Sequence, residues 1–472
     1  MSVANVNMTI DGRALSVPAG TTILEAARAN GVRIPTLCFL KGLDPHASCR
    51  LCVVEVEGAR TFQTACTARV REGMVVRTDT EALRAARRLT LQLLLSNHAV
   101  DCHHCLRVGS TKAEHFDPKF CESCFFCDCV KDGFCELQAL AWEYKVDVLP
   151  FSQKHDVHPV DATAPIVRDP NRCIKCMRCV DVCGKVQTVG NLAASGRGCE
   201  RVVGTASGAS MAESGCVGCG RCVEVCPTGA LFAREHKDEV VYYAHQYGVE
   251  TAASVSADLI PELERVLKLR AGSVTLAEIA GALKKIGVDA VYDAAEAEEA
   301  ARAQAEGLLE ARLRTGGPVI LTNSFAAKSF LEKTFPDRKE SFLFYDSPIA
   351  VFGRAAAHFD RRFAFGPVGG DAAECGRTGC VDIAVNAREL ARIMLRTGSV
   401  PNPGRRAECE RLGLPGASGS YGRLLDKAAW NMDAEPETFE LGGLRCALCH
   451  NLGQARRVLT GGEAFDVIRV IA

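Results

Sequence analysis

The sequence has no excess of charge of either sign: Lys and Arg total 56, Asp and Glu total 57, and the net charge is −1. A protein that neutralises nucleic-acid phosphates needs a basic excess, so we expect no nucleic-acid partner. No run reaches the ~18 apolar residues that a membrane helix needs, which predicts no membrane span. Residues 1–17 are polar and strand-like rather than basic and then apolar, so we expect no signal peptide and a cytoplasmic location.

Two nucleotide-binding signatures are also missing. The chain has no Gly-x-Gly-x-x-Gly fingerprint opening a helix and no phosphate loop, so we expect any nicotinamide or flavin nucleotide to bind a partner. Apolar residues make up 47% of the 472 residues, which provides for large buried cores. At roughly 100–200 residues per domain, this length predicts about three or four domains.

Cysteine is abundant instead, and unevenly spread. Of 25 cysteines, 20 lie between Cys38 and Cys226, none lies between Cys226 and Cys375, and five lie from Cys375 onward. In a reducing compartment such a load indicates metal ligation or redox chemistry rather than disulfides. The front half is therefore expected to be rich in metal sites, and the rear half is expected to have a different function.

The strongest signal is a repeated run. Cys173-x2-Cys176-x2-Cys179-x3-Cys183 returns as Cys216-x2-Cys219-x2-Cys222-x3-Cys226-Pro227. This is the spacing of bacterial two-cluster ferredoxins, in which the fourth cysteine of each run ligates the other 4Fe–4S cluster. The predicted ligand sets are Cys173, Cys176, Cys179 and Cys226 for one cluster, and Cys216, Cys219, Cys222 and Cys183 for the other. Zinc is the alternative, but zinc sites seldom repeat three cysteines at this spacing with a fourth.

An earlier group reads Cys38-x10-Cys49-x2-Cys52-x13-Cys66. Before it, residues 5–17 predict a hairpin turning at Asp11-Gly12, and Thr22 with Glu25 predicts a capping box that opens a short helix. This context fits a β-grasp fold. We interpret the four cysteines as a 2Fe–2S site, with structural zinc as the alternative.

The middle group begins where an amphipathic helix, predicted over 81–96, ends. His98-x3-Cys102-x2-Cys105 has ligand spacing, and Cys135 is the natural fourth ligand of a third 4Fe–4S cluster, one with a histidine ligand. An insert between Cys105 and Cys135 adds four more cysteines within nine residues, a complete ligand set for a further 4Fe–4S cluster or for zinc: Cys121, Cys124, Cys127 and Cys129. A different partition, His98 with Cys127, Cys129 and Cys135, stays open.

Beyond about residue 235 the composition changes. Segments rich in Ala, Glu, Arg and Leu alternate with short apolar strands such as 318–322, which predicts α/β layers. The predicted multidomain α+β architecture has a 2Fe–2S β-grasp domain (1–80), a His/Cys cluster domain with the insert (81–150), a two-cluster ferredoxin domain (151–235) and an α/β domain (236–472). The remaining cysteines are interpreted as buried free thiols and left unassigned: Cys199, Cys375, Cys380, Cys409, Cys446 and Cys449.

The three front groups, in this order, resemble the large iron–sulfur subunit of respiratory complex I. They resemble equally the multi-cluster iron-only hydrogenases and their NAD-linked, electron-bifurcating relatives. The matching segments are Leu94-Leu95-Ser96-Asn97-His98, Asp101-Cys102 and Cys135-Glu136-Leu137-Gln138. The cysteine-rich insert departs from the usual form of the family.

The rear half resembles the active-site domain of iron-only hydrogenases without its cluster ligands. The scaffold matches are 317–336, Ser347-Pro348, Phe352-Gly353 and 388–392. Asn323 and Ser324 stand where the family has two adjacent cysteines, and Gly366-Pro367-Val368 stands for Met-Pro-Cys. The last motif should follow residues 465–472, where the sequence stops. The resemblance therefore implies a catalytically silent domain, because Asn and Val cannot replace thiolates.

This resemblance implies a non-catalytic electron-transfer subunit of an NAD(P)-linked complex, most closely an electron-bifurcating transhydrogenase coupling NADH, NADP(H) and ferredoxin. The implied partners are an FMN- and NAD-binding subunit, a small thioredoxin-like 2Fe–2S subunit, an NADP-binding flavoprotein and ferredoxin. Flavin is expected only in those partners. The alternatives are an electron conduit for a nickel–iron hydrogenase or a formate dehydrogenase, an active iron-only hydrogenase, and a zinc-stapled assembly scaffold.

Overall fold

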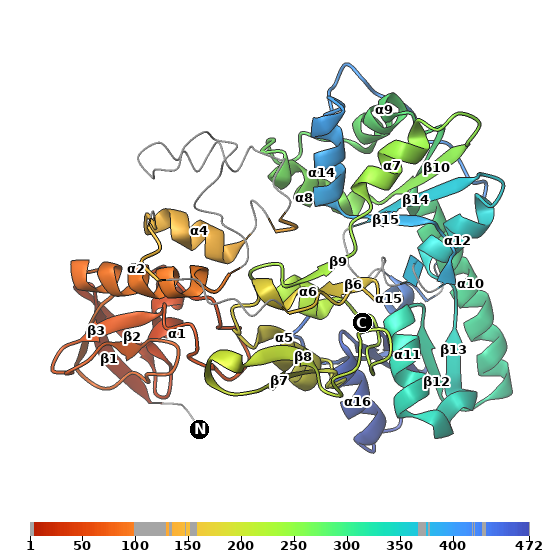
Figure 1. Cartoon of the computed structure of the whole chain (residues 1–472). Coiled ribbons are helices and arrows are strands. Elements are labelled where there is room, and N and C mark those ends of the chain that lie inside the picture. The colour runs from red at the N-terminus through yellow and green to blue at the C-terminus, as the bar shows by residue number, and fades with distance from the viewer. Residues whose placement is uncertain are drawn as a thin grey trace.

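The computed structural model describes residues 4–98, 129–131, 135–146, 148–151, 158–366, 374–375, 378–417, 419, 421–426 and 431–471. Four regions follow along the chain: a front region (4–80), a middle region (81–151), a paired-run region (158–235) and a rear region (236–471). In Figure 1 the front region lies at one end, the rear region at the other, and the paired-run region between them.

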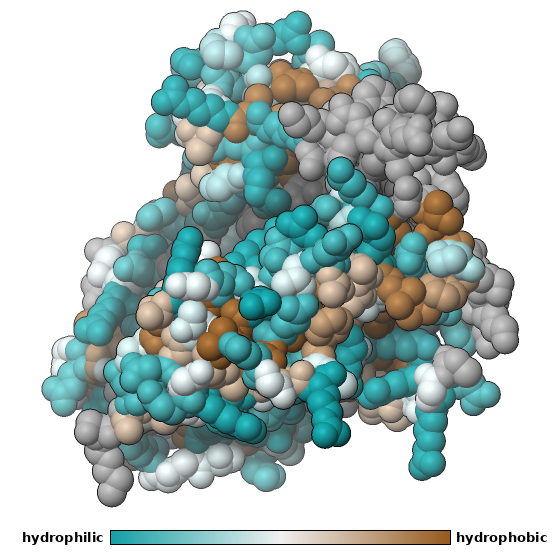
Figure 2. Space-filling model, turned by 90° about the vertical axis from the view of Figure 1, so that its left-hand side faces the viewer, coloured by the Kyte–Doolittle hydropathy of each residue, from teal (hydrophilic) through white to brown (hydrophobic). Residues whose placement is uncertain are grey.

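The front region is a five-stranded mixed sheet in the order β2-β1-β5-β3-β4. The predicted hairpin is confirmed: β1 (Asn5–Ile10) and β2 (Arg13–Pro18) pair antiparallel across Asp11 and Gly12, which both have positive φ, as a tight hairpin turn requires. The capping box of Thr22 and Glu25 opens α1 (Ile23–Ala29) as predicted. The remaining strands are β3 (Val53–Val56), β4 (Gln63–Thr64) and β5 (Met74–Arg77). The face of the molecule that carries this sheet is largely hydrophilic, with scattered apolar patches (Figure 2).

Two helices form the described part of the middle region. The predicted amphipathic helix is α2 (Glu81–Leu95), which buries Leu83, Arg87, Leu91 and Leu95. The second is α4 (Glu136–Glu143), whose N-cap is Cys135. Both pack into one apolar cluster with residues that flank the front cysteines, so the middle region closes over the 2Fe–2S candidate site.

The paired-run region is small and loop-rich. Two short antiparallel ribbons frame it: β6 (Ile166–Arg168) with β9 (Leu231–Ala233), and β7 (Leu192–Ser195) with β8 (Val202–Thr205). Each cysteine run leads into a short helix, α5 (Arg178–Asp181) in the first and α6 (Arg221–Val225) in the second. A π-helical turn at Val182–Val186 continues α5.

The rear region confirms the predicted α/β layering, in two sheets. The first is parallel throughout, in the order β11 (Ala290–Asp293), β10 (Thr251–Val255), β14 (Arg361–Phe365) and β15 (Ile383–Val385). One face packs on α7 (Lys237–Ala244), α8 (Ile260–Val266), α9 (Leu276–Ile286) and α14 (Ala387–Arg396). The other face packs on α10 (Ala294–Thr315) and α12 (Pro348–Ala355).

The second rear sheet has the order β13 (Phe342–Phe344), β12 (Val319–Thr322), β18 (Val467–Val470), β17 (Leu444–Cys449) and β16 (Glu437–Leu441), with only β16 antiparallel to its neighbour. α11 (Phe325–Thr334) and α16 (Leu452–Thr460) cover one face; α10 and α15 (Gly422–Leu425) pack on the other. The long helix α10 therefore serves both sheets. Within the described residues, no helix is long and apolar enough to cross a membrane.

Candidate iron–sulfur cluster sites

The structure brings all four front cysteines together in the interior. Their side chains are buried, and they form two close couples. The Cys49 thiol hydrogen-bonds the Cys38 sulfur, and the Sγ atoms of Cys52 and Cys66 lie 3.4 Å apart. The loop between Cys38 and Cys52 reaches this geometry through positive φ angles at Ala47 and Arg50, a conformation that costs free energy for residues other than glycine.

The front thiols affect one another's ionisation. The hydrogen bond shared with Cys49 lowers the pKa of Cys38 to about 5, and the one shared with Cys66 lowers the pKa of Cys52 to about 7. The pKa values of Cys49 and Cys66 are raised, first because each shares its proton with its neighbour and then because burial disfavours a second negative charge. Four buried thiolates need positive charge beside them, and a pair of iron ions fits this soft sulfur donor set.

Arg87 fixes the loop that carries the front cysteines. It comes from α2, is only 2% exposed, and donates to the backbone carbonyls of Leu51, Val53 and Thr78 at 3.1, 2.7 and 2.9 Å. Its Nη1 also donates to the Tyr144 hydroxyl at 3.2 Å. In the sequence, Arg87 lies four residues from both Leu83 and Leu91, on the apolar side of the helix. This spacing is the one signal of its role in the sequence.

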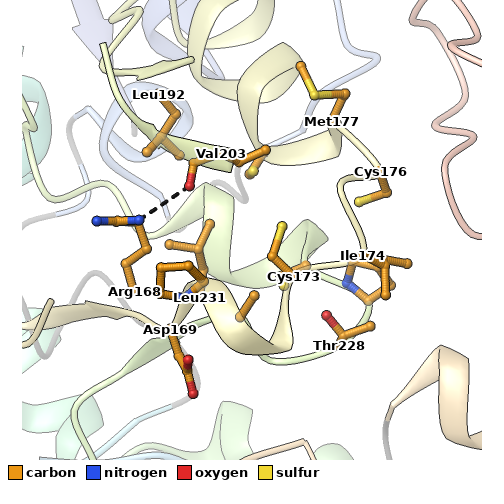
Figure 3. Close-up of a pocket in the computed structure, with 15 residues that line it drawn as sticks. Arg168, Asp169, Cys173, Ile174, Cys176, Met177, Leu192, Val203, Thr228 and Leu231 are labelled. Carbon is orange, nitrogen blue, oxygen red and sulfur yellow. Dashed lines mark hydrogen bonds between the residues drawn. The ribbon is translucent and has the colours of Figure 1, made fainter. Parts of the chain in front are cut away.

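In the paired-run region, the eight run cysteines line two separate cavities. One cavity is lined by Cys173, Cys176, Cys179 and Cys226. The other is lined by Cys183, Cys216, Cys219 and Cys222. Each cavity thus takes three sulfurs from one run and the fourth from the other run, the crossed arrangement that the spacing predicts. Figure 3 shows Cys173 and Cys176 in the lining of the first cavity, which also includes the apolar residues Leu192, Val203 and Leu231.

The two runs share one backbone design. The second residue after the first cysteine and the residue after the second cysteine have positive φ in both runs, at Lys175 and Met177 and at Gly218 and Gly220. This turns backbone N–H groups toward sulfur: Lys175 N donates to Cys173 Sγ, and Gly218 N donates to Cys216 Sγ, both at 3.4 Å. Such N–H groups stabilise negative charge on the sulfurs of a cluster.

Burial opposes ionisation of these thiols. It raises the pKa of Cys173 to about 11 and of Cys176 to about 12, and it places the pKa values of Cys179 and Cys222 well above the usual range. A positively charged centre in each cavity would reverse this cost. The residues present therefore fit a cluster of iron ions in each cavity.

The middle group is described only in part. His98, Cys129 and Cys135 are all buried, whereas five predicted ligands lie outside the described residues: Cys102, Cys105, Cys121, Cys124 and Cys127. Burial raises the pKa of Cys135 to about 12, and the nearby charges of Cys129 and Cys226 add to this shift. Cys129 and Cys135, which share a set in one of the two predicted partitions, therefore lie near each other.

Sites from three regions meet in one apolar cluster. It contains Cys38 and Cys49 of the front site, Cys135 of the middle group and Cys176 of the first cavity, packed with Leu37, Leu51, Leu91, Leu137 and Leu140. Arg178 adds a charge here: its Nη1 and Nη2 donate to the Glu136 carboxylate at 2.6 and 3.0 Å, and its charge interacts with Cys176 and Cys38. Sequence spacing gave no signal of this convergence.

The second cavity faces the rear region. Val217, from its lining, packs with residues of α11, α16 and β18. Gln187 Oε1, also from the lining, accepts from Leu452 N at 3.0 Å. Gly453 lies so close to Val186 that a Cβ there would overlap the Val186 carbonyl. The rear region thus covers one side of this cavity.

Of the positions expected to replace hydrogenase cluster ligands, Ser324 has a structural role. Ser324 is the N-cap of α11, and its Oγ accepts from Ala327 N at 3.3 Å. Asn323 directly follows β12, Gly366 directly follows β14, and Pro367 and Val368 lie outside the described residues. Across the described ranges, no group of three or more His, Cys, Asp or Glu side chains is placed to hold a single metal ion.

Three family matches fit this geometry. Residues 3–81 match the 2Fe-2S iron-sulfur cluster binding domain, and residues 172–230 match the 4Fe-4S dicluster domain. Residues 249–412 match the C-terminal domain of the iron only hydrogenase large subunit. The chain is an iron–sulfur protein with a hydrogenase-like rear region.

Relatives of this iron–sulfur protein include components of several oxidoreductases. It is 36% identical over 298 residues to the NADP-reducing hydrogenase subunit HndD of Solidesulfovibrio fructosivorans, covering 61% of this chain and 46% of the relative. It is 38% identical over 231 residues to a component of an NADH-quinone oxidoreductase of Rhizobium meliloti, covering 48% and 24%. It is 33% identical over 232 residues to the NADPH-Fe(3+) oxidoreductase subunit alpha of Geobacter sulfurreducens, covering 49% and 24%. The matched part is less than half of each relative.

Proposed function

We propose that this chain is the electron-transfer subunit of an NAD(P)-linked oxidoreductase complex. The observation that carries the proposal is the meeting of cysteines from the front site, the middle group and the first cavity in one apolar cluster. Iron–sulfur clusters, when bound, supply one-electron carriers whose potentials depend on burial and on hydrogen bonds to sulfur. The residues around them exclude water and hold the sulfurs in place.

The proposed ligand sets follow the contacts. In the front site, the two couples suggest one iron held by Cys38 and Cys49 and the other by Cys52 and Cys66. In the paired-run region, we assign one 4Fe–4S cluster to each cavity with the crossed fourth ligand. The sets are Cys173, Cys176, Cys179 and Cys226, and Cys216, Cys219, Cys222 and Cys183.

For the middle group, His98 and Cys135 are proposed ligands of a third 4Fe–4S cluster. The nearness of Cys129 to Cys135 supports the partition in which these two serve the same centre. Arg388 and Arg392 of α14 donate to the Cys129 carbonyl at 2.8 and 2.9 Å, which ties this ligand to the rear region. In that partition His98 and Cys127 complete the set, and the metal held by the remaining insert cysteines is a question for metal analysis.

The order of the sites supports a route through the molecule. The front site and the middle group both adjoin the first cavity, and the second cavity adjoins the rear region. We therefore propose that electrons from two entry sites merge at the cluster of the first cavity and pass to the cluster of the second. The rear region then acts as a cover and a docking body without a catalytic cluster of its own.

The nature of the whole complex is proposed from the relatives, which are named as parts of an NADP-reducing hydrogenase, an NADH-quinone oxidoreductase and an NADPH-Fe(3+) oxidoreductase. We favour an electron-bifurcating NADH/NADP/ferredoxin transhydrogenase in the cytoplasm. Its partners would be a flavin- and NAD-binding subunit, a thioredoxin-like 2Fe–2S subunit and an NADP-binding flavoprotein. We propose four domains with limits at residues 80, 150 and 235.

The test is anaerobic purification of the native complex, identification of its subunits, and iron and zinc analysis with electron paramagnetic resonance. One 2Fe–2S and three 4Fe–4S clusters require about 14 iron atoms per chain, or about 18 with a further cluster in the insert. Reducible paramagnetic centres with this iron content would support the electron-transfer role. A colourless chain containing zinc and almost no iron would contradict it and favour the assembly scaffold.

A further inference from the structure

Two cysteines of the rear region, remote in sequence from every cluster ligand, lie against each other. Gly379 has φ +63°, and its N–H donates to the Cys375 carbonyl at 3.0 Å. A turn ended by a left-handed glycine brings the residue four before it together with the residue that follows it. Here these residues are Cys375 and Cys380, and the Cys375 thiol hydrogen-bonds the Cys380 sulfur.

The surroundings of Cys380 favour its thiolate. The Thr378 hydroxyl donates to Cys380 Sγ at 3.0 Å, so this sulfur accepts hydrogen bonds from both Thr378 and Cys375. These two donors outweigh the cost of burial and lower the pKa of Cys380 to about 6. A thiolate that is populated at neutral pH is the reactive form of cysteine.

The two sulfurs differ in access. Cys375 is 6% exposed, whereas Cys380 is only half-buried. Cys380 is also held firmly, because its backbone rests against α12 where Gly353 leaves no room: a Cβ on Gly353 would overlap the Cys380 carbonyl. A reagent from solvent therefore meets Cys380 first, with Cys375 directly behind it.

We propose that Cys380 and Cys375 form a redox-active dithiol that exchanges with low-molecular-weight aliphatic disulfides. Cys380 is the attacking residue and Cys375 the resolving residue. This site stands apart from the iron–sulfur sites and does not depend on the proposed electron-transfer function.

The exchange balances in two steps. The Cys380 thiolate attacks one sulfur of R–S–S–R, so that a Cys380–S–R bond forms and R–S⁻ leaves. Cys375 gives its proton to the departing thiolate and attacks the Cys380 sulfur, so that the Cys375–Cys380 bond forms and the second R–S⁻ leaves. The protein loses two electrons and the Cys375 proton, and the second R–S⁻ takes its proton from water, so that the disulfide becomes two thiols.

The sequence makes this pair easy to observe. Arg362, Arg377 and Arg388 place Cys375 and Cys380 in adjacent tryptic peptides, 363–377 and 378–388, each with one cysteine. We would treat the full-length, cluster-loaded protein anaerobically with hydroxyethyl disulfide, quench it in acid, alkylate free thiols and digest it. The expected product is the two peptides joined by one disulfide, and the Cys375→Ser variant should instead trap hydroxyethanethiol on Cys380.

Controls separate this site from general thiol reactivity. Cys409 is partly exposed, but burial together with the Asp293 and Glu410 carboxylates raises its pKa. Cys409 should therefore react at no more than about one tenth of the rate of Cys380. Thr378→Val should move the pH at which Cys380 alkylates at half its maximal rate from about 6 to a higher value. Recovery of both peptides as separately alkylated monothiols, or equal rates for Cys380 and Cys409, would overturn the proposal.

Discussion

Cysteines of the paired-run region and cysteines of β17 are similarly buried, yet they occupy different kinds of structure. Cys222, in α6, and Cys226, directly after it, line cavities with other sulfurs, and left-handed residues bend the chain that leads into α6. Cys446 and Cys449 lie within a β-ladder and pack among apolar side chains of the second rear sheet. Burial raises the pKa of Cys222 well above the usual range and that of Cys449 to about 12, so burial alone does not distinguish a ligand from a packing residue. A ligand is distinguished from a packing residue by the grouping of several sulfurs around one cavity.

The first test of this difference replaces one cysteine of each kind with alanine. Cys226→Ala should abolish the 4Fe–4S cluster of the cavity that holds Cys173 and lower the iron content by about four atoms per chain, because three thiolates leave the cage open. Cys446→Ala should leave the iron content unchanged. Iron analysis and electron paramagnetic resonance check both; loss of the other cavity's signal in Cys226→Ala would contradict the crossed assignment.

A second test compares two arginines on one helix, α2. Arg87→Met should destabilise the protein by about 3 kcal/mol or more, because three backbone carbonyls lose their buried donor. Loss of this positive charge should also lower the midpoint potential of the 2Fe–2S centre. Arg84→Met is the matched control: Arg84 is 63% exposed and paired with Asp79, so its removal should cost less than about 1 kcal/mol.

Both variants can be checked by thermal unfolding and by redox titration followed by electron paramagnetic resonance. If Arg87→Met left both the unfolding temperature and the 2Fe–2S potential as they are in Arg84→Met, Arg87 would have no role at the site.

The third test concerns a carboxyl group in the rear region that works against stability. Burial raises the pKa of Glu389 to about 7, although it accepts from the backbone N–H groups of His236 and Asn386. The folded form therefore binds this proton more tightly than the unfolded form does. Between pH ~4.5 and ~7 stability should fall as pH rises, by about 3 kcal/mol in total from this group.

Glu389→Gln keeps an acceptor and removes the ionisation, so it should flatten this pH dependence and stabilise the protein mainly above pH 7. Thermal unfolding from pH 5 to pH 8 measures the effect. An unchanged pH profile in the variant would show that Glu389 does not ionise in the folded protein within this window.

The fourth test, for which we expect the smallest effect, asks whether a change in the stability of the rear region leaves the iron content unchanged. Gly307 lies within α10, and a Cβ there would meet nothing within 4 Å. Gly307→Ala should raise stability by about 0.5–1 kcal/mol, because glycine loses more backbone entropy than alanine in a helix. Gly281→Ala in α9 is the contrast, since its Cβ would overlap the Arg405 carbonyl and should destabilise the fold. Neither should alter the iron content, and a change in Gly307→Ala would contradict a purely structural rear region.

The sequence was sufficient for features set by local chemistry. The hairpin at Asp11 and Gly12, the capping box at Thr22 and helix α2 each depend on residues a few positions apart. The crossed sharing of sulfurs was also predictable, because the spacing of the two runs leaves the fourth cysteine of each run out of reach of its own loop. The α/β alternation of the rear region was predicted, but its division into two sheets was not.

Features made by tertiary contact escaped prediction. The spacing of Cys129 and Cys135 leaves open whether they share a set, and the role of Arg87 depends on carbonyls more than thirty residues away in the front region. The contact of Cys375 with Cys380 was missed because a five-residue separation carries no signal until Gly379 closes the turn.

The shared lining of the two paired-run cavities sets a condition on biosynthesis. A nascent chain that has emerged as far as Cys183 carries three sulfurs for one cavity and a single sulfur for the other. One donor set needs Cys222 and the other needs Cys226, so neither is complete until the second run has left the ribosome and folded back. Both centres must therefore be loaded after this stretch of the polypeptide has been made, and the delivery machinery should recognise the folded pair rather than either half.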